Sequence, residues 1–465
     1  MTVDPERPED ARPPAWPRAW RMVQASHPQA TRKRWPYYIR HVPRARECSV
    51  YSRATSCGWP AGGWPAGRGW PAGRGWPAAL RVVCGLALLL VLVSVALLIL
   101  RINYRQPPRL AVAVAANSSG AMFGFDVQHT HFNPAEHRIN SENVSHLVLD
   151  WSASTGKVII AAPVVANGIV YVGSYDQMLH AYNAATGKTV WAAPTTASIG
   201  SSAAVAAGIV YVGSNDRRLY AFNARTGARV WSLITGGEIW SSPTVANGML
   251  YIGSNDGTLY AFNALTGKAI WIYATGDQVS SSPAVYQGVV YVGSEDDYLY
   301  ALDARTGHLR WKAQVGLPIR VSSPAIVNGV VYVGSEDGKL YAFDARTGKT
   351  LWTARTGGFT HSSPAVADGL VYIGSTDHGL YAFDARTGKR VWATVTGAVI
   401  DSSPTVANGV VYIGSQDHRL YALDAQTGKI LWSYRAGDGI DSSPAIANGV
   451  VYVGSWDGKL YAFHL

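Results

Sequence analysis

The chain has 465 residues, a formal net charge of +10 at neutral pH and three cysteines. The basic charge is confined to its start, because residues 1–81 hold 14 Lys and Arg against 5 Asp and Glu, whereas residues 151–465 hold 22 against 21. A nearly neutral C-terminal region is a poor electrostatic match for a phosphate backbone, so we expect no nucleic-acid partner. Cys48, Cys57 and Cys84 all lie near the start, which excludes disulfides and thiolate chemistry from the rest.

Residues 1–81 are rich in Pro, Arg, Trp and Gly, and residues 58–78 repeat GWPAG. Proline fixes φ and removes a backbone donor in each copy, so neither a helix nor a strand ladder is expected there. The composition predicts a disordered tail.

An apolar run, VVCGLALLLVLVSVALLIL, occupies residues 82–100 and contains no charge. As a helix it would reach about 28 Å, close to the hydrocarbon thickness of a bilayer. A cleaved signal peptide is the alternative, since AVAVAA at 111–116 offers small residues for cleavage. The run is longer than a signal-peptide core and lies ten residues from that site, so we predict a transmembrane signal anchor at 82–100 and a linker at 101–122.

Charge also predicts the orientation of this helix. Three arginines flank it on each side, and only the wider basic tail breaks the tie in favour of a cytoplasmic N-terminus. We therefore expect a single-pass membrane protein whose residues 123–465 lie outside the cytoplasm.

The C-terminal two-thirds of the chain repeats with a period of 40 residues, once 41. One copy divides into four short segments typical of strands, at 322–329, 330–335, 339–345 and 349–354, with Asn328-Gly329 suited to a tight hairpin. Four antiparallel strands per repeat predict a propeller blade. Eight tryptophans keep this period and are expected to staple adjacent blades: Trp151, Trp191, Trp231, Trp271, Trp311, Trp352, Trp392 and Trp432.

The two ends of the repeat region predict eight blades. Trp151 has no preceding copy of the other strands, and the last copy stops at LYAFHL (460–465) without its own Trp strand. Residues 147–151 would complete the last blade and close the ring without a free edge. The prediction for residues 123–465 is an all-β, eight-bladed propeller latched by its N- and C-terminal strands.

Copies of the repeat end in [DN]-A-x-T-G-x-x-x-W, as from Asp344 to Trp352, which resembles the tryptophan-docking repeat of quinoprotein (PQQ) dehydrogenase-like propellers. The segment FGFDVQHTHFNPAEHRINSENVSHLVLDW (123–151) resembles the lead-in of the same family. The resemblance implies the fold over residues 123–465. It leaves function open, because the family includes both quinone-dependent dehydrogenases and small non-catalytic members similar to an outer-membrane assembly lipoprotein.

Comparing the copies with one another separates scaffold from site. An Asp follows Y-[VI]-G-S in all eight copies, from Asp176 to Asp457, and is expected to accept backbone N–H groups in a turn. By strand alternation, the nearly invariant hairpins lie on one face, and the variable connections lie on the other.

We expect the variable face to bind the partner, at two sets of positions. The inner set precedes Ser-Ser-Pro: Gly200, Trp240, Ser280, Arg320 with Val321, His361, Asp401 and Asp441. The outer set follows Y-[VI]-G-S: Tyr175, Asn215, Asn255, Glu295, Glu336, Thr376, Gln416 and Trp456. Ordinary variation of solvated loops remains an alternative to a specific site.

Three functions follow. The first is a non-catalytic, membrane-anchored binding module without cofactor or metal, which presents Trp240, Arg320, His361, Asp401, Asp441, Glu295 and Trp456 to a protein or surface polymer. The second is an alcohol or sugar dehydrogenase using PQQ with calcium, with Trp240 stacked on the cofactor, Arg320 neutralising a quinol oxygen and Asp401 or Asp441 as base or calcium ligand. The third is transition-metal binding by His361, His378 and His418 with Asp401.

Overall fold

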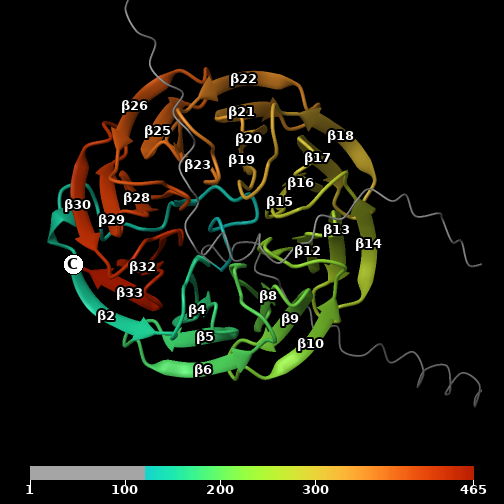
Figure 1. Ribbon diagram of the computed structural model, residues 1–465, viewed down its shortest axis with the longest axis horizontal. Coiled ribbons are helices and arrows are strands. Elements are labelled where there is room, and N and C mark those ends of the chain that lie inside the picture. Colours follow the sequence, from blue (N-terminus) through green and yellow to red (C-terminus); the bar gives the residue numbers. More distant parts are fainter. Residues whose placement is uncertain (1–120) are drawn as a thin grey trace, which may run out of the picture. The chain divides into compact units, whose positions relative to one another are not determined.

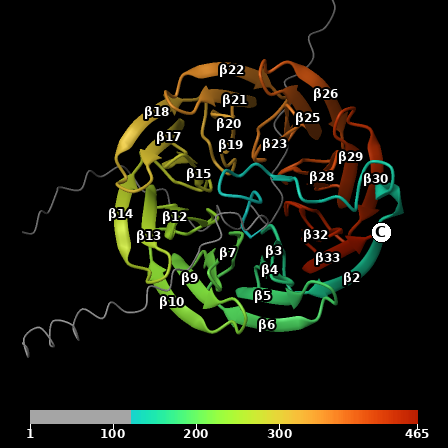
Figure 2. The ribbon, with the colours of Figure 1, turned by 180° about the vertical axis from the view of Figure 1, so that it is seen from behind.

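The computed structural model describes residues 121–465, which form a closed ring of eight sheets with four antiparallel strands each (Figures 1 and 2). This confirms the predicted eight-bladed propeller. The predicted tail, transmembrane helix and nearly all of the predicted linker lie outside the described residues. Within residues 121–465, no helix is both long and apolar enough to cross a bilayer.

In each blade the strands follow one another from the centre of the ring to its rim. The innermost strands are β3 (Val164–Ala166), β7 (Ala204–Ala206), β11 (Thr244–Ala246), β15 (Ala284–Tyr286), β19 (Ala325–Val327), β23 (Ala365–Ala367), β27 (Thr405–Ala407) and β31 (Ala445–Ala447). The second strands are β4 (Ile169–Gly173), β8 (Ile209–Gly213), β12 (Met249–Ser254), β16 (Val289–Gly293), β20 (Val330–Ser335), β24 (Leu370–Gly374), β28 (Val410–Ser415) and β32 (Val450–Gly454).

The outer half of each blade carries the aromatic residues of the repeat. The third strands are β5 (Met178–Asn183), β9 (Arg218–Asn223), β13 (Thr258–Asn263), β17 (Tyr298–Asp303), β21 (Lys339–Asp344), β25 (Gly379–Asp384), β29 (Arg419–Asp424) and β33 (Lys459–His464). The outermost strands are β6 (Thr189–Pro194), β10 (Arg229–Ile234), β14 (Ala269–Ala274), β18 (Leu309–Gln314), β22 (Thr350–Arg355), β26 (Arg390–Val395), β30 (Ile430–Arg435) and β2 (Val148–Ser154). Blades are numbered 1 to 8 in the order of these lists.

The predicted strands of blade 5 agree with β19 to β22 to within one residue except for the first, which spans Ala325–Val327 rather than residues 322–329. Before it, the Ser323 N–H donates to Ser363 Oγ of the next blade and Ser322 Oγ accepts the Gly334 N–H, in place of strand pairing. Asn328 and Gly329 both have positive φ, at 50° and 77°, as the predicted tight hairpin requires.

Blade 8 is built from both ends of the described chain. β2 pairs antiparallel with β33, with Trp151 opposite Ala462, and so completes the sheet of β31, β32 and β33. The predicted latch is therefore confirmed. It leaves no blade without its outermost strand.

Tryptophans join each blade to the next. The Nε1 atom of Trp191 donates to the Ala224 carbonyl at 3.0 Å, and a Cβ placed on Gly227 would lie 2.8 Å from the Trp191 indole. The same donor role recurs in all eight tryptophans, ending with Trp151 to Ala184 and Trp432 to Leu147. The glycine of the T-G turn is thus needed for the close approach of the indole.

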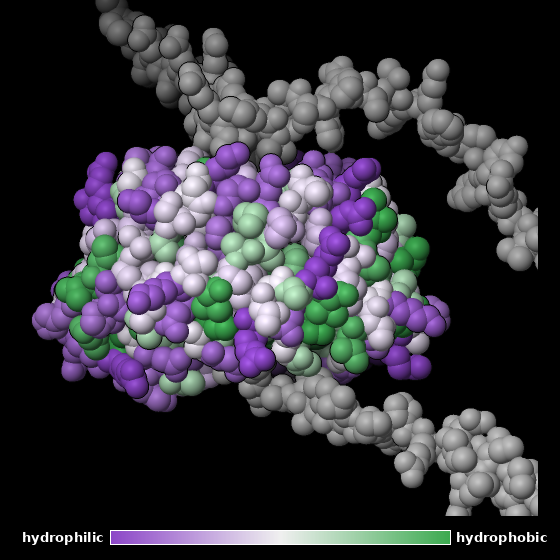
Figure 3. All heavy atoms as spheres, turned by 90° about the horizontal axis from the view of Figure 1, so that it is seen from below, coloured by the Kyte–Doolittle hydropathy of each residue, from purple (hydrophilic) through white to green (hydrophobic). Residues whose placement is uncertain are grey.

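The blade interfaces are filled by the apolar residues of the two middle strands. Val170, Leu179 and Val210 are fully buried, and equivalent residues recur in each blade. The outermost strands expose apolar side chains singly among polar ones, which is visible on the rim in side view (Figure 3).

A single-copy segment, residues 121–133, crosses the centre of the ring and is called the lead-in segment below (Figures 1 and 2). Its carbonyls accept hydrogen bonds from the innermost strands of blades 2, 4, 5, 6 and 7, and its end, β1 (Phe132–Asn133), pairs parallel with β27. The 3-10 helix η1 (Val144–His146) then leads into β2. Ala121 and Met122, predicted as linker, are already buried in the propeller.

Candidate functional site

The predicted variable face is built from connections that bond to one another. The Tyr175 N–H donates to the Val158 carbonyl, and the Ile199 N–H donates to the Ser174 carbonyl. The hairpin between the second and third strands therefore lies against the connections that enter and leave its blade. This places both sets of predicted positions on one face, which we call the mouth.

Buried residues hold each inner position in place. Ile199, Ile239, Ile319, Ile400 and Ile440 are fully buried, and each immediately precedes an inner position. A Cβ on Gly213 would lie 2.2 Å from the Ile239 side chain. Only glycine at this position of Y-[VI]-G-S leaves room for the buried isoleucine, which we call the anchor. The residue after each anchor is thereby held at the mouth.

A ring of serines lies directly below the inner positions. The N–H of Ser202 donates to Ser242 Oγ of the next blade at 3.0 Å, and six equivalent bonds of 2.9–3.0 Å link the other blades from Ala162 round to Ser443. Blade 1 has Ala162 where the other blades have serine, so the eighth bond, from the Ser443 N–H, has no hydroxyl to accept it.

Arg320 joins two outer-set carboxylates. Its Nε lies 3.4 Å from Glu295 Oε2, and its Nη1 lies 3.2 Å from Glu336 Oε1. Glu295 also accepts a 2.7 Å hydrogen bond from Ser280. Glu295 thus sits between two inner side chains, and Arg320 is held from both sides.

His361 continues the network. Its Nε2 lies 3.2 Å from Glu336 Oε1 and its Nδ1 lies 3.0 Å from Asp401 Oδ1, while only 3% of its side chain is exposed. Burial alone would lower the pKa of His361, but the two carboxylates raise it to about 9, so the imidazolium is present at neutral pH. The hydrogen bond from His361 and the charge of Arg320 in turn outweigh burial and lower the pKa of Glu336.

Gln416 bridges the last two inner carboxylates. Its Nε2 donates to Asp401 Oδ2 at 3.0 Å and to Asp441 Oδ1 at 3.1 Å. Burial, followed by the charge of Asp401, raises the pKa of Asp441 well above its ordinary value. The indole N–H of Trp456 is close enough to Asp441 to lower its pKa, against the effect of burial. The Trp456 Nε1 does not, however, meet ordinary hydrogen-bond geometry.

Trp240 lies three blades before His361 in blade order. A Cβ on Gly200 would lie 3.0 Å from its indole, so the missing side chain there lets Trp240 lean toward blade 1. Its Nε1 donates to Glu238 at 3.1 Å, and its ring meets that of Tyr175 edge-on at 6.5 Å.

All seven predicted site residues therefore lie in the mouth, and five of them are linked by the contacts above: Glu295, Arg320, His361, Asp401 and Asp441. The role of all seven in binding stays a prediction. Sequence reasoning missed Glu238, which lies two residues before the inner set, where copies differ without an obvious pattern. His418 lies 3.7 Å from Asp438. Among residues 121–465, no three His, Cys, Asp or Glu side chains are grouped so that they could hold a metal ion, so the predicted histidine site does not form.

The repeated Asp residues are turn carboxylates, as predicted. Asp216 accepts the Arg218 N–H at 2.9 Å. It also accepts the Tyr220 hydroxyl at 2.6 Å, a bond that recurs in blades 2 to 8 and that the sequence did not suggest. These carboxylates belong to the scaffold.

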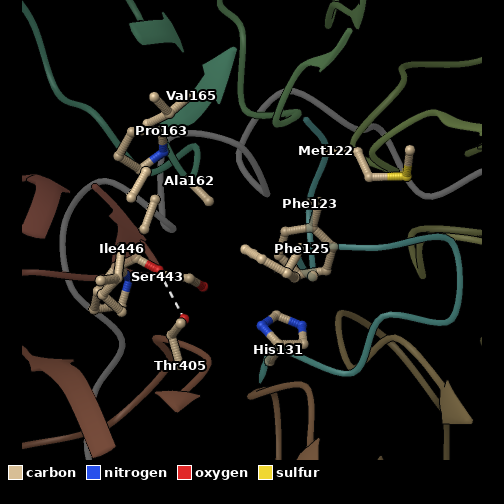
Figure 4. Close-up of a pocket in the computed structure, with 14 residues that line it drawn as sticks. Met122, Phe123, Phe125, His131, Ala162, Pro163, Val165, Thr405, Ser443 and Ile446 are labelled. Carbon is tan, nitrogen blue, oxygen red and sulfur yellow. Dashed lines mark hydrogen bonds between the residues drawn. The ribbon is translucent and has the colours of Figure 1, made fainter. Parts of the chain in front are cut away.

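A cavity of about 40 Å³ lies at the centre of the ring, between the lead-in segment and blades 8 and 1 (Figure 4). Phe123, Phe125 and His131 face Ala162 and Ser443 across it. Burial lowers the pKa of His131 to about 3, so its imidazole is neutral. Sequence reasoning did not find this cavity, because the lead-in segment occurs once.

Comparison with known proteins supports this architecture. A family model described as outer membrane protein assembly factor BamB matches residues 148–239, 233–352, 319–399 and 394–464. No curated protein matches the chain.

Solved structures share the fold at low sequence identity. BamB from Moraxella catarrhalis is 21% identical with a TM-score of 0.61, over 69% of this chain and 100% of that one. A europium-containing methanol dehydrogenase is 17% identical with a TM-score of 0.64, over 74% and 98%. Quinohemoprotein alcohol dehydrogenase from Comamonas testosteroni is 19% identical with a TM-score of 0.65, over 76% and 81%.

The repeat match extends over more than half of the chain, and the blade-joining tryptophans occupy the same repeats. The chain therefore belongs to the BamB-like family of PQQ-type repeat β-propellers.

Proposed function

We propose that this protein is a non-catalytic binding module that presents its mouth to a protein or surface-polymer partner. The observation that carries the proposal is the contrast between the scaffold positions, which repeat in every blade, and the mouth, where Trp240, Arg320, His361 and Asp441 occupy equivalent positions. A protein partner is favoured because the matching family model is named for an assembly factor.

The charge of the mouth argues against the dehydrogenase alternative. PQQ is a tricarboxylate, whereas the mouth network contains four carboxylates, a fifth carboxyl group with a raised pKa at Asp441, and only two cationic groups, Arg320 and His361. Both cationic groups are already paired with carboxylates. The residues present therefore do not fit an anionic quinone, and no catalytic step is derived from it.

We also propose that residues 82–100 anchor the protein in a membrane with residues 121–465 outside the cytoplasm. The support is the uncharged run of helix-spanning length and the basic tail before it. Protease treatment of intact cells tests the orientation: the propeller should be released from the surface, whereas protection of the propeller would reverse it.

Site-specific cross-linking tests the binding face. A photoreactive residue at position 240 should yield a discrete cross-linked product in intact cells. The matched control is Gln287, exposed in the hairpin between the first and second strands of blade 4, on the opposite face. Equal products from both positions, or none from position 240, would contradict the assignment. A dye-reduction response to added PQQ and Ca²⁺ with an alcohol would restore the dehydrogenase alternative.

A further inference from the structure

One side of the mouth gathers three aromatic rings around two carboxylates. Trp240 lies edge-on to Tyr175, with ring centroids 6.5 Å apart, and donates its N–H to Glu238. On the other side of Tyr175 in blade order, the Trp456 indole lies over Gly439, and its N–H acts on Asp441. We call these five side chains, Tyr175, Glu238, Trp240, Asp441 and Trp456, the aromatic cage.

Neither carboxyl group of the cage forms an ion pair with a described residue, although the charge of His361 acts on Asp441. Arg320 and His361 are paired with Glu295, Glu336 and Asp401. Asp441 accepts from the neutral amide of Gln416, and Glu238 accepts from the neutral indole of Trp240. Burial and Asp401 raise the pKa of Asp441, whereas Glu238 keeps its charge without an ion pair to a described residue, so Glu238 is the carboxylate that would attract a positively charged ligand.

Tyr175 provides a separate indication of a ligand. It is partly buried, and both Asp441 and Glu238 add to the effect of burial in raising the pKa of its phenol. Its hydroxyl makes no hydrogen bond to any other described residue, although the tyrosines of the neighbouring scaffold nearly all do, as Tyr171 does with the Ala224 carbonyl. The hydroxyl is therefore available to accept a hydrogen bond from a ligand.

We propose that the aromatic cage binds an alkylammonium group, the side chain of a lysine presented by the protein partner. The aromatic faces attract a cation, and an ammonium group has three donors to meet the two carboxylates and the Tyr175 oxygen. The small residue at Gly200 leaves the space into which Trp240 leans, so that one face of the cage is formed by a residue from two blades away. This inference rests on the proposed binding function and specifies the chemistry of its partner.

Calorimetric titration of the full-length protein with a short lysine-rich peptide tests the cage. The same peptide acetylated on its lysine side chains keeps the length and loses the charge. We expect measurable binding of the first peptide, at least tenfold weaker binding of the second, and loss of affinity as salt is raised.

Two substitutions keep the shape of the cage: Glu238→Gln removes its charged carboxylate, and Asp441→Asn replaces a carboxyl group whose pKa is raised. Glu238→Gln should weaken binding of the lysine peptide about tenfold, a change of 1.4 kcal/mol, and Asp441→Asn should weaken it less. The matched control is Asp277→Asn, which removes an exposed carboxylate from an equivalent connection of blade 4 outside the cage. Glu238 is partly exposed, so Glu238→Gln should fold normally even if Asp441→Asn does not.

No binding by the unaltered protein, or the same loss in Asp277→Asn as in Glu238→Gln, overturns the cage. Cross-linking from position 240 distinguishes this failure from failure of the binding function. A cross-linked partner without lysine binding would reject the cage alone, whereas absence of both would reject the proposed function as well.

Discussion

The seams between blades and the mouth use polar side chains in opposite ways. At the seams the same neutral donors recur round the ring, as the Trp191 indole and the Tyr171 hydroxyl do when they share the Ala224 carbonyl. At the mouth, equivalent positions hold an aromatic ring, a guanidinium, an imidazolium and carboxylates. The comparison suggests that repeated positions supply stability and unrepeated positions supply recognition, and each prediction below alters one of them.

The largest expected effect is at the seam closed by the latch. Trp151→Ala removes the bond to Ala184 and the packing over Gly187, so unfolding should become easier by about 3 kcal/mol. Because Trp151 also holds the latch strand, hydrogen exchange in β2 should accelerate. Trp271→Ala, within the continuous chain, should lose similar stability without faster exchange in β2. Equal hydrogen exchange in β2 of both variants would show that Trp151 does not hold the latch strand more firmly than other tryptophans hold theirs. Both variants should still bind at the mouth.

The mouth predicts a pH dependence with a definite sign. The folded-state pKa of His361 is raised to about 9 from 6.5, so its charged pairs with Glu336 and Asp401 contribute fully below pH 6.5. This contribution is lost as the pH rises through 9, because the folded state then releases the proton as well. Arg320, Gln416 and Asp441 face the same network.

Denaturant unfolding of the unaltered protein and of His361→Gln measures this loss. The advantage of the unaltered protein should be on the order of 2 kcal/mol at pH 6 and should shrink toward pH 10. Subtracting the variant removes the contributions of other titrating groups. A difference that stays constant with pH would show that the imidazole is not charged in the folded protein.

One seam breaks the pattern of shared carbonyls and gives a smaller effect. Tyr412 is fully buried at the seam between blades 7 and 8, and its hydroxyl lacks a partner in the described part of the chain. There the turn of the next blade is replaced by the chain entering β2, and Trp432 bonds to Leu147 instead.

Tyr412→Phe should therefore be neutral or stabilising, whereas Tyr211→Phe, which removes the bond to Ala264, should cost about 1 kcal/mol. Thermal unfolding of the two variants measures the difference. A similar loss in both would mean that Tyr412 has a hydrogen-bond partner in solution.

Much of the seam was predictable from the sequence because its signals repeat. Local geometry is specified by three signals: the regular spacing of the tryptophans, the Asn328-Gly329 hairpin and the N-terminal strand around Trp151 that completes blade 8. Eight copies of one blade geometry close a ring. The lead-in segment was described only by resemblance, and its path across the centre went unpredicted, since a single-copy segment offers no internal comparison.

The sequence predicted which residues lie at the mouth but not which of them contact one another. Internal comparison found Arg320, Glu295 and His361, because these positions differ between copies. It could not show that Arg320 would reach two glutamates, since that depends on side-chain reach across blades. Glu238 was missed for the same reason, as its contact with Trp240 depends on the direction in which the indole leans.

The smallest expected effect comes from completing the serine ring. Ala162→Ser places a hydroxyl where the Ser443 N–H lacks its equivalent acceptor, and the adjoining cavity of about 40 Å³ has room for it. Unfolding should become harder by about 0.5–1 kcal/mol. Ser282→Ala removes the bond from the Ser242 N–H and should cost a similar amount. If Ser282→Ala is destabilising but Ala162→Ser does not raise stability, the Ser443 N–H already has another hydrogen-bond partner. The alanine at position 162 would then not cost the protein a hydrogen bond.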